Sequence, residues 1–443
     1  MTRIRPFKGI QFNARKVDSL DRVMSPPYDI IAPEMQSQLY KKSDYNLVRV
    51  ILGKEEKGDN KRINKYTRAA TLFEQWRRKG ILNQSKKSAV YPYQIKYESD
   101  GEQRELNGFF ALLKLDPSYS WIKAHESTLS KPKLDRLNLT RTVNANLEPI
   151  EVLYPDEKNK VDGIIKDSIG DSSPNISVNG WDGFRHFLWN LEDEAVLEEI
   201  TKQFEDKILF IADGHHRYQT AIDFMQETLS KNPRLPEDSP LRYRMAVLVN
   251  MQHPGLTILP THRLIHSVQG FEPKRLLTNV KPYFEIEKLR IGKNPDSKTK
   301  GEELMRTIGE EKGRSKIFAF YPQTARKDGL CYLLTLKDIS VMNEIEQGHS
   351  KVWRRLDAAV LHSLLLAQCL GINKGRVEEH VAYTKSSEEA ISLVDEGKYQ
   401  AAFLLNPTGI EELKDVVLAN ELMPQKSTYF LPKLLSGLVM NSF

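Results

Sequence analysis

The chain has 443 residues, of which 40% are hydrophobic and 28% are charged, a composition typical of soluble globular proteins with two or three domains. The net charge of +6 is small for this length, and acidic and basic residues are mixed throughout, which argues against a dedicated nucleic-acid-binding protein. Two cysteines, Cys331 and Cys369, cannot form a CxxC pair or a thiolate zinc cage.

Nothing in the sequence predicts contact with a membrane. The amino-terminal residues lack the apolar stretch of a signal peptide. The longest apolar stretch, residues 361–372, is interrupted by His362, Ser363 and Gln368 and is too polar to span a bilayer. We therefore expect a protein of the reducing cytoplasm.

Strands and helices are predicted to alternate along the chain. Hydrophobic patterns predict strands over residues 44–52, 89–97, 107–113, 208–212, 245–251, 316–321, 331–336 and 400–405, and helices over residues 66–79, 218–229, 357–370, 387–396 and 409–418. No GxGxxG fingerprint or P-loop is present. We expect a mixed α/β fold in three segments, an α/β region over 1–114, a core over 115–270 that holds most of the motifs, and an α/β domain over 271–443.

A polar elbow follows the apolar run of residues 208–212. It consists of Asp213, Gly214, His215, His216 and Arg217, and helical spacing begins directly after it. A strand, a glycine turn and a helix start direct backbone N–H groups and cationic side chains at one point, where phosphate binds well. The alternative is an ordinary turn whose histidines bond to local carbonyls.

A second stretch combines a carboxylate with cations. Glu126 follows His125 and precedes Lys131, Lys133 and Arg136. An enzyme that phosphorylates a hydroxyl needs a carboxylate to accept the alcohol's proton and cations to offset the charge on the transferred group. The alternative is that Glu126 is a surface residue in a basic loop.

Three further stretches are candidate substrate contacts. A lysine followed by two hydroxyls suits a carboxylate or a phosphate, two prolines hold a tyrosine and an aspartate in a rigid loop, and a His-Arg pair ends a strand region. The first stretch contains Lys426, Ser427 and Thr428, the second contains Tyr28 and Asp29, and the third contains His262 and Arg263. Each stretch has a structural alternative, because such runs arise by chance, rigid loops also turn corners, and the His-Arg pair can bond to an acidic neighbour.

Two kinds of hydrolase chemistry find no support in the sequence. The side chains of the adjacent His215 and His216 diverge and cannot easily share a tetrahedral zinc, and no HExxH spacing is present. There is also no GxSxG elbow of a serine hydrolase. Metal ligands cannot be assigned from these patterns.

Together the motifs resemble those of DUF1015, a widespread bacterial family of proteins of unknown function. The matching stretches are residues 25–29, His125-Glu126, residues 212–217, residues 260–263 and residues 423–428. They are spread over nearly the whole chain. The family name implies no activity.

The elbow is also similar to that of the free L-serine kinases of archaea. Those kinases have a ParB/sulfiredoxin-like fold, a His-Glu pair upstream of the elbow, and a Pro-Lys-(Ser/Thr)-Thr segment near the carboxyl end. This resemblance implies a ParB/sulfiredoxin-like catalytic core, with Glu126 as the base, residues 213–217 as the phosphate site and residues 426–428 in the substrate pocket. The first segment of this chain has no counterpart there, and the cluster of Lys131, Lys133 and Arg136 looks like an addition.

On this basis the sequence predicts a phosphotransferase that converts free L-serine to O-phosphoserine with Mg²⁺. ADP is the donor in the archaeal enzymes, and the added cations would equally suit pyrophosphate, so both donors stay open. The alternative is a non-enzymatic ParB-like regulator that binds a nucleotide and associates with DNA. The mild charge of the chain and the lack of a clear helix-turn-helix argue against this alternative. Oligomeric state cannot be inferred from the sequence.

Overall fold

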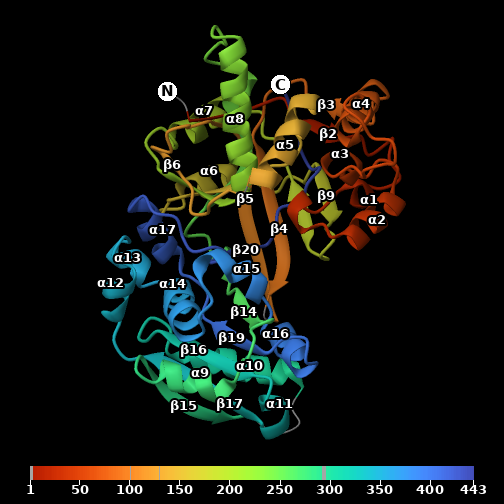
Figure 1. The fold of residues 1–443 in the computed structure, drawn as a ribbon. Helices are drawn as coiled ribbons and strands as arrows, with labels where there is room; N and C mark the ends of the chain where they lie inside the picture. Colours follow the sequence, from red (N-terminus) through yellow and green to blue (C-terminus); the bar gives the residue numbers. More distant parts are fainter. Residues whose placement is uncertain (1–2, 100, 129, 292–295) are drawn as a thin grey trace. The chain divides into compact units, whose positions relative to one another are not determined.

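The computed structural model describes residues 3–99, 101–128, 130–291 and 296–443 (Figure 1). The fold is mixed α/β, as predicted. The chain forms two compact units: unit 1 comprises Met1–Thr257 and Pro432–Phe443, and unit 2 comprises Ile258–Leu431.

Unit 1 is organised around one mixed sheet. Its described strands are β1 (Ile4–Arg5), β4 (Tyr91–Ser99), β5 (Glu102–Lys114), β6 (Ile122–Lys123), β8 (Ile150–Tyr154), β9 (Ile176–Asn179), β10 (Arg185–Leu188), β11 (Leu209–Asp213) and β12 (Tyr243–Asn250). They lie in the order β6-β11-β8-β12-β5-β4-β10-β9, with β1 paired to β5. The β11–β6 and β12–β8 pairs are parallel, and the other pairs are antiparallel. Smaller pairs join β2 (Ile10–Phe12) to β3 (Leu82–Gln84) and β7 (Ala145–Asn146) to β21 (Asn441–Ser442).

This division differs from the three predicted segments. Strand β5 pairs with β4 on one side and β12 on the other, so residue 114 ends a strand inside one sheet. The last residues of the chain also belong to unit 1, where the backbone of Ser436 bonds to that of Ser25 and the backbone of Met440 to that of Ile10. Pairing between distant segments, which local patterns do not report, sets the boundary.

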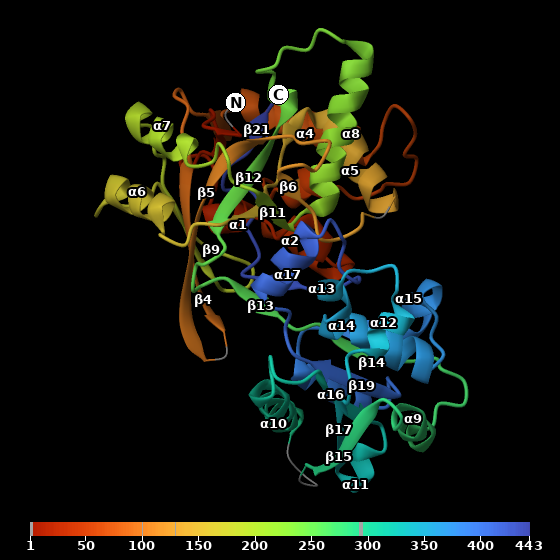
Figure 2. The same cartoon turned by 90° about the vertical axis from the view of Figure 1, so that its left-hand side faces the viewer.

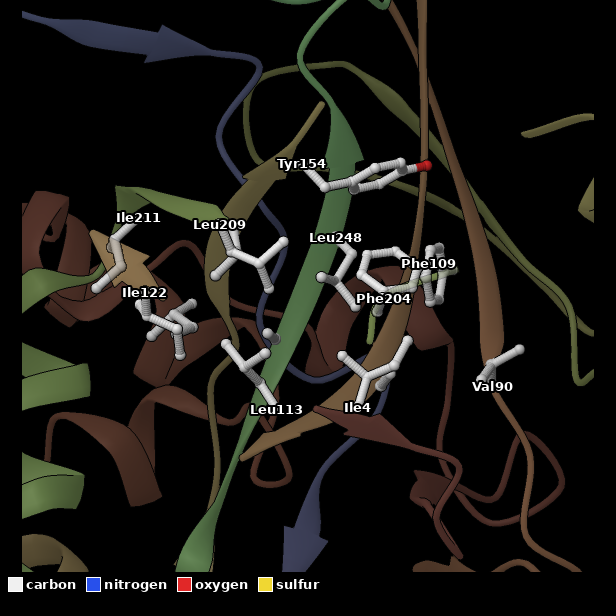
Figure 3. Close-up of a cluster of buried hydrophobic side chains, with 14 of the residues drawn as sticks. Ile4, Val90, Phe109, Leu113, Ile122, Tyr154, Phe204, Leu209, Ile211 and Leu248 are labelled. Atoms are coloured by element: carbon white, nitrogen blue, oxygen red, sulfur yellow. The ribbon is translucent and has the colours of Figure 1, made fainter. Parts of the chain in front are cut away.

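A continuous apolar core lies on one face of this sheet. Figure 3 shows Phe109, Tyr154 and Phe204 packed together among aliphatic side chains, and the Phe204 ring centroid lies 5.8 Å from that of Phe109 and 4.9 Å from that of Tyr154. Leu209 and Ile211 of β11 belong to the same core. The apolar run that precedes the elbow therefore anchors it to the centre of unit 1.

The helices of unit 1 lie around this sheet (Figure 2). They are α1 (Leu20–Val23), the 3₁₀ turn η1 (Tyr28–Ile30), α2 (Pro33–Lys42), α3 (Val48–Ile51), α4 (Lys65–Arg78), α5 (Ser130–Val143), α6 (Lys160–Ile169), α7 (Glu194–Lys202), α8 (His215–Lys231) and the 3₁₀ turn η2 (Pro240–Arg242). Helices α5 and α8 pack against each other. Residues of α6, α7 and α8 contribute to the core of Figure 3.

The strand predicted over residues 44–52 is wrong, because this segment forms the short helix α3. The Asn46 side chain accepts the backbone N–H of Val48 at 3.0 Å and donates to the carbonyls of Arg22 and Met24, each at 2.8 Å. These bonds start a helical turn. A short apolar run that is buried on all sides has no periodicity to distinguish the two structures.

Unit 2 contains an antiparallel sheet. Its strands are β15 (Phe284–Arg290), β17 (Leu330–Leu336), β16 (Ile317–Pro322), β19 (Ala401–Leu405), β14 (His262–Ile265) and β18 (Val381–Thr384), in that order across the sheet. Strands β13 (Thr257–Leu259) and β20 (Tyr429–Leu431) pair where the chain enters and leaves this unit. Helices α10 (Ser297–Glu310) and α16 (Ser387–Asp395) pack against each other, and their Leu304 and Ile391 share a core with Ala402 of β19.

The remaining helices of unit 2 are short. They are α9 (Pro273–Val280), α11 (Ala325–Asp328), α12 (Val341–Ile345), α13 (Lys351–Arg354), α14 (Asp357–Val360), the π-helix η3 (Leu361–Cys369), the 3₁₀ turn η4 (Lys374–Arg376), α15 (Val377–His380) and α17 (Ile410–Leu418). The helix predicted over 357–370 is thus α14 continued by a π-helix. Across the described ranges of both units, no helix has the length and apolar character needed to cross a membrane.

Candidate active site

The predicted elbow forms as a strand, a left-handed glycine and a long helix. Gly214, between β11 and α8, has φ +89°, and a Cβ atom there would lie 2.8 Å from Ile150 Cγ2 and 3.0 Å from Arg217 Nε. Only glycine fits both the backbone angle and the space. Because glycine has no side chain to cap the helix, the first N–H groups of α8 are left without an acceptor from the N-cap. Such a terminus suits an anion.

Asp213 is held inside unit 1 by two cations. Its Oδ2 lies 2.5 Å from Arg217 Nη2, and its Oδ1 accepts a hydrogen bond from Lys433 Nζ. Burial alone would raise the pKa of Asp213, but Lys433 and Arg217 outweigh burial and hold that pKa well below its usual range. Arg217 also donates to the carbonyl of Pro149. The charged groups of Asp213 and Arg217 therefore brace the elbow from within.

Glu126 lies beside the first residue of α8. Its Oε2 is 3.7 Å from His215 Nδ1, and its side chain is 35% exposed. His215 Nε2 accepts the backbone N–H of His125 at 3.4 Å, so the neutral ring has its proton on Nδ1, facing Glu126. Burial, followed by the neighbouring His125, lowers the pKa of His215 well below its ordinary value. The carboxylate thus adjoins a neutral imidazole at the helix terminus.

His125 supports this arrangement from below the surface. Its Nδ1 donates to the carbonyl of Ile211 at 2.9 Å, and its ring meets that of His215 edge to face, with centroids 4.5 Å apart. Burial lowers its pKa to about 4, so it is neutral at physiological pH. His216, next along α8, is half-buried.

Tyr28, Asp29 and Arg136 meet around a buried carboxylate, Glu148. The Glu148 Oε1 accepts the backbone N–H of Tyr28 at 3.0 Å, and its Oε2 lies 3.6 Å from Arg136 Nη1. The Arg136 guanidinium stacks over the Tyr28 ring at 3.9 Å. Asp29 is close enough to help raise the pKa of Lys433, together with Asp213, against the lowering effect of burial. The charged groups near the elbow are therefore those of Asp29, Arg136, Glu148 and Lys433.

Lys133, which was also predicted to bind phosphate, does not lie at the elbow. Lys133 Nζ lies 3.2 Å from Asp223 Oδ2, eight residues along α8 from His215, or about 12 Å along the helix axis. The side chain of Lys131 lies outside the described part of the structure. Of the predicted cluster, Arg136 alone is shown to approach the elbow network.

The remaining predicted residues form a cluster of their own in unit 2. Arg263 Nη2 donates to the carbonyl of Lys426 at 3.2 Å, which joins two motifs that are 163 positions apart. His262 and Arg263 are buried, and burial lowers the pKa of His262 to about 3 and that of Arg263 to about 10. Ser427 Oγ donates to the carbonyl of Pro424, and Thr428 follows it. Arg263 therefore contacts the Lys426 loop rather than solvent.

Sequence reasoning missed Lys433 and two buried glutamates, Glu148 and Glu151. Glu151 lies opposite Asp213 on the paired strands β8 and β11, and neither of its buried carboxylate oxygens has a hydrogen-bond partner in the described structure. Burial and the charge of Asp213 raise its pKa to about 8. The sequence signal that could have identified these glutamates is their place beside and within an otherwise apolar strand, where an acidic residue is costly to bury.

Among the residues that the structure describes, the acidic and histidine side chains do not form a metal centre. In the described ranges, no three or more His, Cys, Asp or Glu side chains gather in a way that could hold a metal ion. Asp213 is already paired with two cations. Glu126, in contrast, is a partly exposed acidic residue at the elbow.

Comparisons with solved structures gave distant similarities. A free serine kinase mutant in complex with ADP has 12% identity and a TM-score of 0.34, covering 75% of this chain and 92% of that chain. A conserved hypothetical protein from Pyrococcus furiosus has 12% identity and a TM-score of 0.31, covering 75% and 95%. SbnI with a C-terminal truncation, from Staphylococcus aureus, has 11% identity and a TM-score of 0.32, covering 74% and 85%.

Among curated proteins, no sequence matches this chain. The model of one protein family, described as a protein of unknown function (DUF1015), matches residues 4–359. That match includes the Tyr28 loop, Glu126, the elbow and Arg263. Because it covers most of the sequence, the chain belongs to the DUF1015 family.

Proposed function

We propose that the chain is a phosphotransferase that phosphorylates the hydroxyl of free L-serine, with Glu126 as the general base. The observation that supports this proposal is the position of the Glu126 carboxylate, 3.7 Å from His215 Nδ1 at the start of α8. A proton acceptor and a helix terminus suited to phosphate are then neighbours, as transfer to an alcohol requires. The order of the three motifs, as in free serine kinases, agrees with it.

In the proposed step, the serine hydroxyl loses its proton to Glu126 while its oxygen attacks the terminal phosphorus of the donor. The bond from that phosphorus to the bridging oxygen breaks, and AMP leaves if the donor is ADP, or phosphate if it is pyrophosphate. N–H groups in the first turn of α8 hold the phosphoryl group. His215, neutral because it is buried, orients the carboxylate without supplying a competing positive charge.

Magnesium enters the proposal with the donor. Mg²⁺ commonly keeps several waters and binds through one or two carboxylates plus substrate phosphates. In this proposal the ion is held by the donor phosphates and by waters, because Glu126 accepts the hydroxyl proton and Asp213 is already paired with Lys433 and Arg217. The ion would offset the charge on the donor phosphates.

We also propose that Lys426, Ser427 and Thr428 of unit 2 bind a carboxylate group. An ammonium and two hydroxyls suit the carboxylate of an amino acid. Arg263, which bonds to the Lys426 carbonyl, holds this loop. Lys426 has φ +56°, a backbone angle that costs free energy for a residue with a side chain and so needs such support.

One experiment tests both the identity of the phosphoryl donor and the role of L-serine as the acceptor. The full chain is incubated with L-serine, Mg²⁺ and either ADP, ATP or pyrophosphate, and O-phosphoserine is measured by mass spectrometry. Product with ADP or pyrophosphate supports the proposal and identifies the donor. If no donor phosphorylates serine, yet a nucleotide binds and DNA affinity falls steeply with salt, the chain is a nucleotide-binding regulator instead.

The assignment of the base is tested by Glu126→Gln, which keeps the shape of the side chain and removes its basicity. Turnover should fall by roughly 10² to 10⁴-fold while donor binding is retained. Glu157→Gln, at an exposed position of the same unit, is the matched control and should leave turnover unchanged. Full activity in Glu126→Gln would exclude Glu126 as the base.

A further inference from the structure

A separate cavity of about 570 Å³ lies in unit 1, within the size range of small-molecule sites. It is lined by residues of α6, of β4 and β5, and of the turn at His253 and Pro254; Figure 2 shows α6 beside the two strands. None of the elbow residues lines it. Strands β12 and β8 lie between β5 and β11, so the cavity and the elbow occupy different parts of the sheet.

One wall of the cavity is a row of hydrogen-bonding side chains. Gln94 and Asn107 are direct partners on β4 and β5, and Gln94 Nε2 donates to Asn107 Oδ1 at 3.2 Å. Asn107 Nδ2 donates to Glu105 Oε1 at 3.1 Å and lies 3.2 Å from His253 Nε2. Two amides, a carboxylate and an imidazole thus face a space large enough for a ring system.

The remaining walls add an aromatic ring and a second carboxylate. The Trp189 ring lines the cavity and is anchored by its Nε1, which donates to the carbonyl of Ser172 at 2.9 Å. Asp162 of α6 is half-buried, and its Oδ1 accepts the Tyr154 hydroxyl at 3.0 Å. The charged residues of the lining are Glu105, Asp162 and Lys166, which leaves a net negative charge.

Gly163 is one of the residues that line this cavity. It lies in the interior of α6, where glycine costs about 1 kcal/mol relative to alanine. Its φ is not in the left-handed region, and a Cβ atom at this position would meet nothing within 4 Å. Neither backbone angle nor packing requires glycine here. A larger side chain would occupy the space that the cavity now offers.

We propose that this cavity binds a purine base or nucleoside without phosphate. Side-chain amides pair with the edge of a purine, carboxylates accept from an exocyclic amine, and an indole ring stacks on the base. The net negative lining disfavours a phosphorylated ligand. The proposal does not depend on the phosphoryl-transfer activity, because it concerns different residues.

Isothermal titration of the full chain with adenosine, guanosine and AMP tests the proposal. At least one nucleoside should bind, and more tightly than AMP. Gly163→Leu should weaken nucleoside binding by at least about tenfold, because leucine fills the cavity while favouring the helix. Gly309→Leu, at a helical glycine of α10 whose Cβ position is also open, is the matched control and should bind as the wild type does.

Three results would overturn the proposal: no binding of either nucleoside, equal binding by Gly163→Leu and the wild type, or tighter binding of AMP than of the nucleosides. Circular dichroism of Gly163→Leu confirms that the fold is kept. Serine phosphorylation by the same variant is expected to persist, so failure of this site and failure of the proposed function are distinguishable.

Discussion

Two buried arginines, one in each unit, are held in different ways. Arg217 of unit 1 lies 2.5 Å from the carboxylate of Asp213. Arg263 of unit 2 donates to His362 Nε2 and to the Lys426 carbonyl, each at 3.2 Å, and to the Thr261 carbonyl, and in the described structure it has no ion pair. Burial disfavours the charge of both. For Arg217 the acidic neighbours outweigh burial and raise the pKa, whereas the pKa of Arg263 falls to about 10.

The difference shows two ways of fixing a loop that bears functional residues. In unit 1, opposite charges from β11, α8 and the carboxyl-terminal segment compensate one another, and each depends on the others. In unit 2, neutral acceptors satisfy the Arg263 guanidinium, and no carboxylate of the described residues pairs with it. Removal of one charge should therefore have a larger effect in unit 1 than in unit 2.

The largest effect is expected for Lys433→Met. This change leaves the buried Asp213 with Arg217 alone, and loss of one partner of a buried pair costs about 3–5 kcal/mol. Arg263→Met leaves carbonyls rather than a charge unsatisfied and should cost about 1–2 kcal/mol. Hydrogen exchange of β11 amides in the first variant and β14 amides in the second measures the two free energies of opening. Equal losses, or a larger loss in unit 2, would contradict the comparison.

A further effect, whose size depends on pH, is expected for Glu151→Gln. An unfolded glutamate ionises near pH 4.5, whereas Glu151 keeps its proton until about pH 8 because of burial and Asp213. Its contribution to stability is therefore complete below pH 4.5 and is lost as the pH rises to 8. The variant avoids this loss, so its melting temperature should exceed that of the wild type by an amount that grows from pH 5 to pH 8.

The matched control for this titration is Glu157→Gln, because Glu157 is exposed. Its melting temperature should follow that of the wild type across the same pH range. A constant difference between Glu151→Gln and the wild type from pH 5 to pH 8 would mean that Glu151 is already ionised at pH 5.

The smallest effect is expected for Gly214→Ala, which adds one methyl group at the elbow. The change forces alanine into φ +89° and places its Cβ against Ile150, at a cost of about 2 kcal/mol. Gly183→Ala is the control, because Gly183 has φ +83° but open space around it, and it should lose about 1 kcal/mol. Urea denaturation measures both. Equal losses would show that contact with Ile150 is unimportant.

Local patterns in the sequence were sufficient for the elbow and for most of the strands and helices that they predicted. The apolar run before Asp213 forms β11, the helical spacing after it forms α8, and the strand predicted over 89–97 corresponds to β4. Periodicity works there because one face is buried and the other is not. It failed for residues 44–52, where burial on all sides removed the contrast and Asn46 started a helix.

Contacts between residues far apart in the sequence could not be predicted from local patterns. The pairing of Lys433 with Asp213 and that of Arg263 with the Lys426 carbonyl join positions 220 and 163 residues apart. Lys433 is a single lysine in a largely apolar stretch, and no local feature of the sequence identifies Asp213 as its partner. The order of strands across the sheet brings such residues together.

By itself, the sequence determined where a strand ends in a glycine turn and a helix begins, because backbone angles and hydrophobic spacing are local properties. It also determined the residue types available for chemistry at Glu126 and at the elbow. Only the tertiary structure decided that Glu126 adjoins His215, that Glu151 is buried opposite Asp213, and that Arg263 faces inward. Burial and charge pairing depend on segments that meet through the whole fold, and these contacts set the pKa of each group.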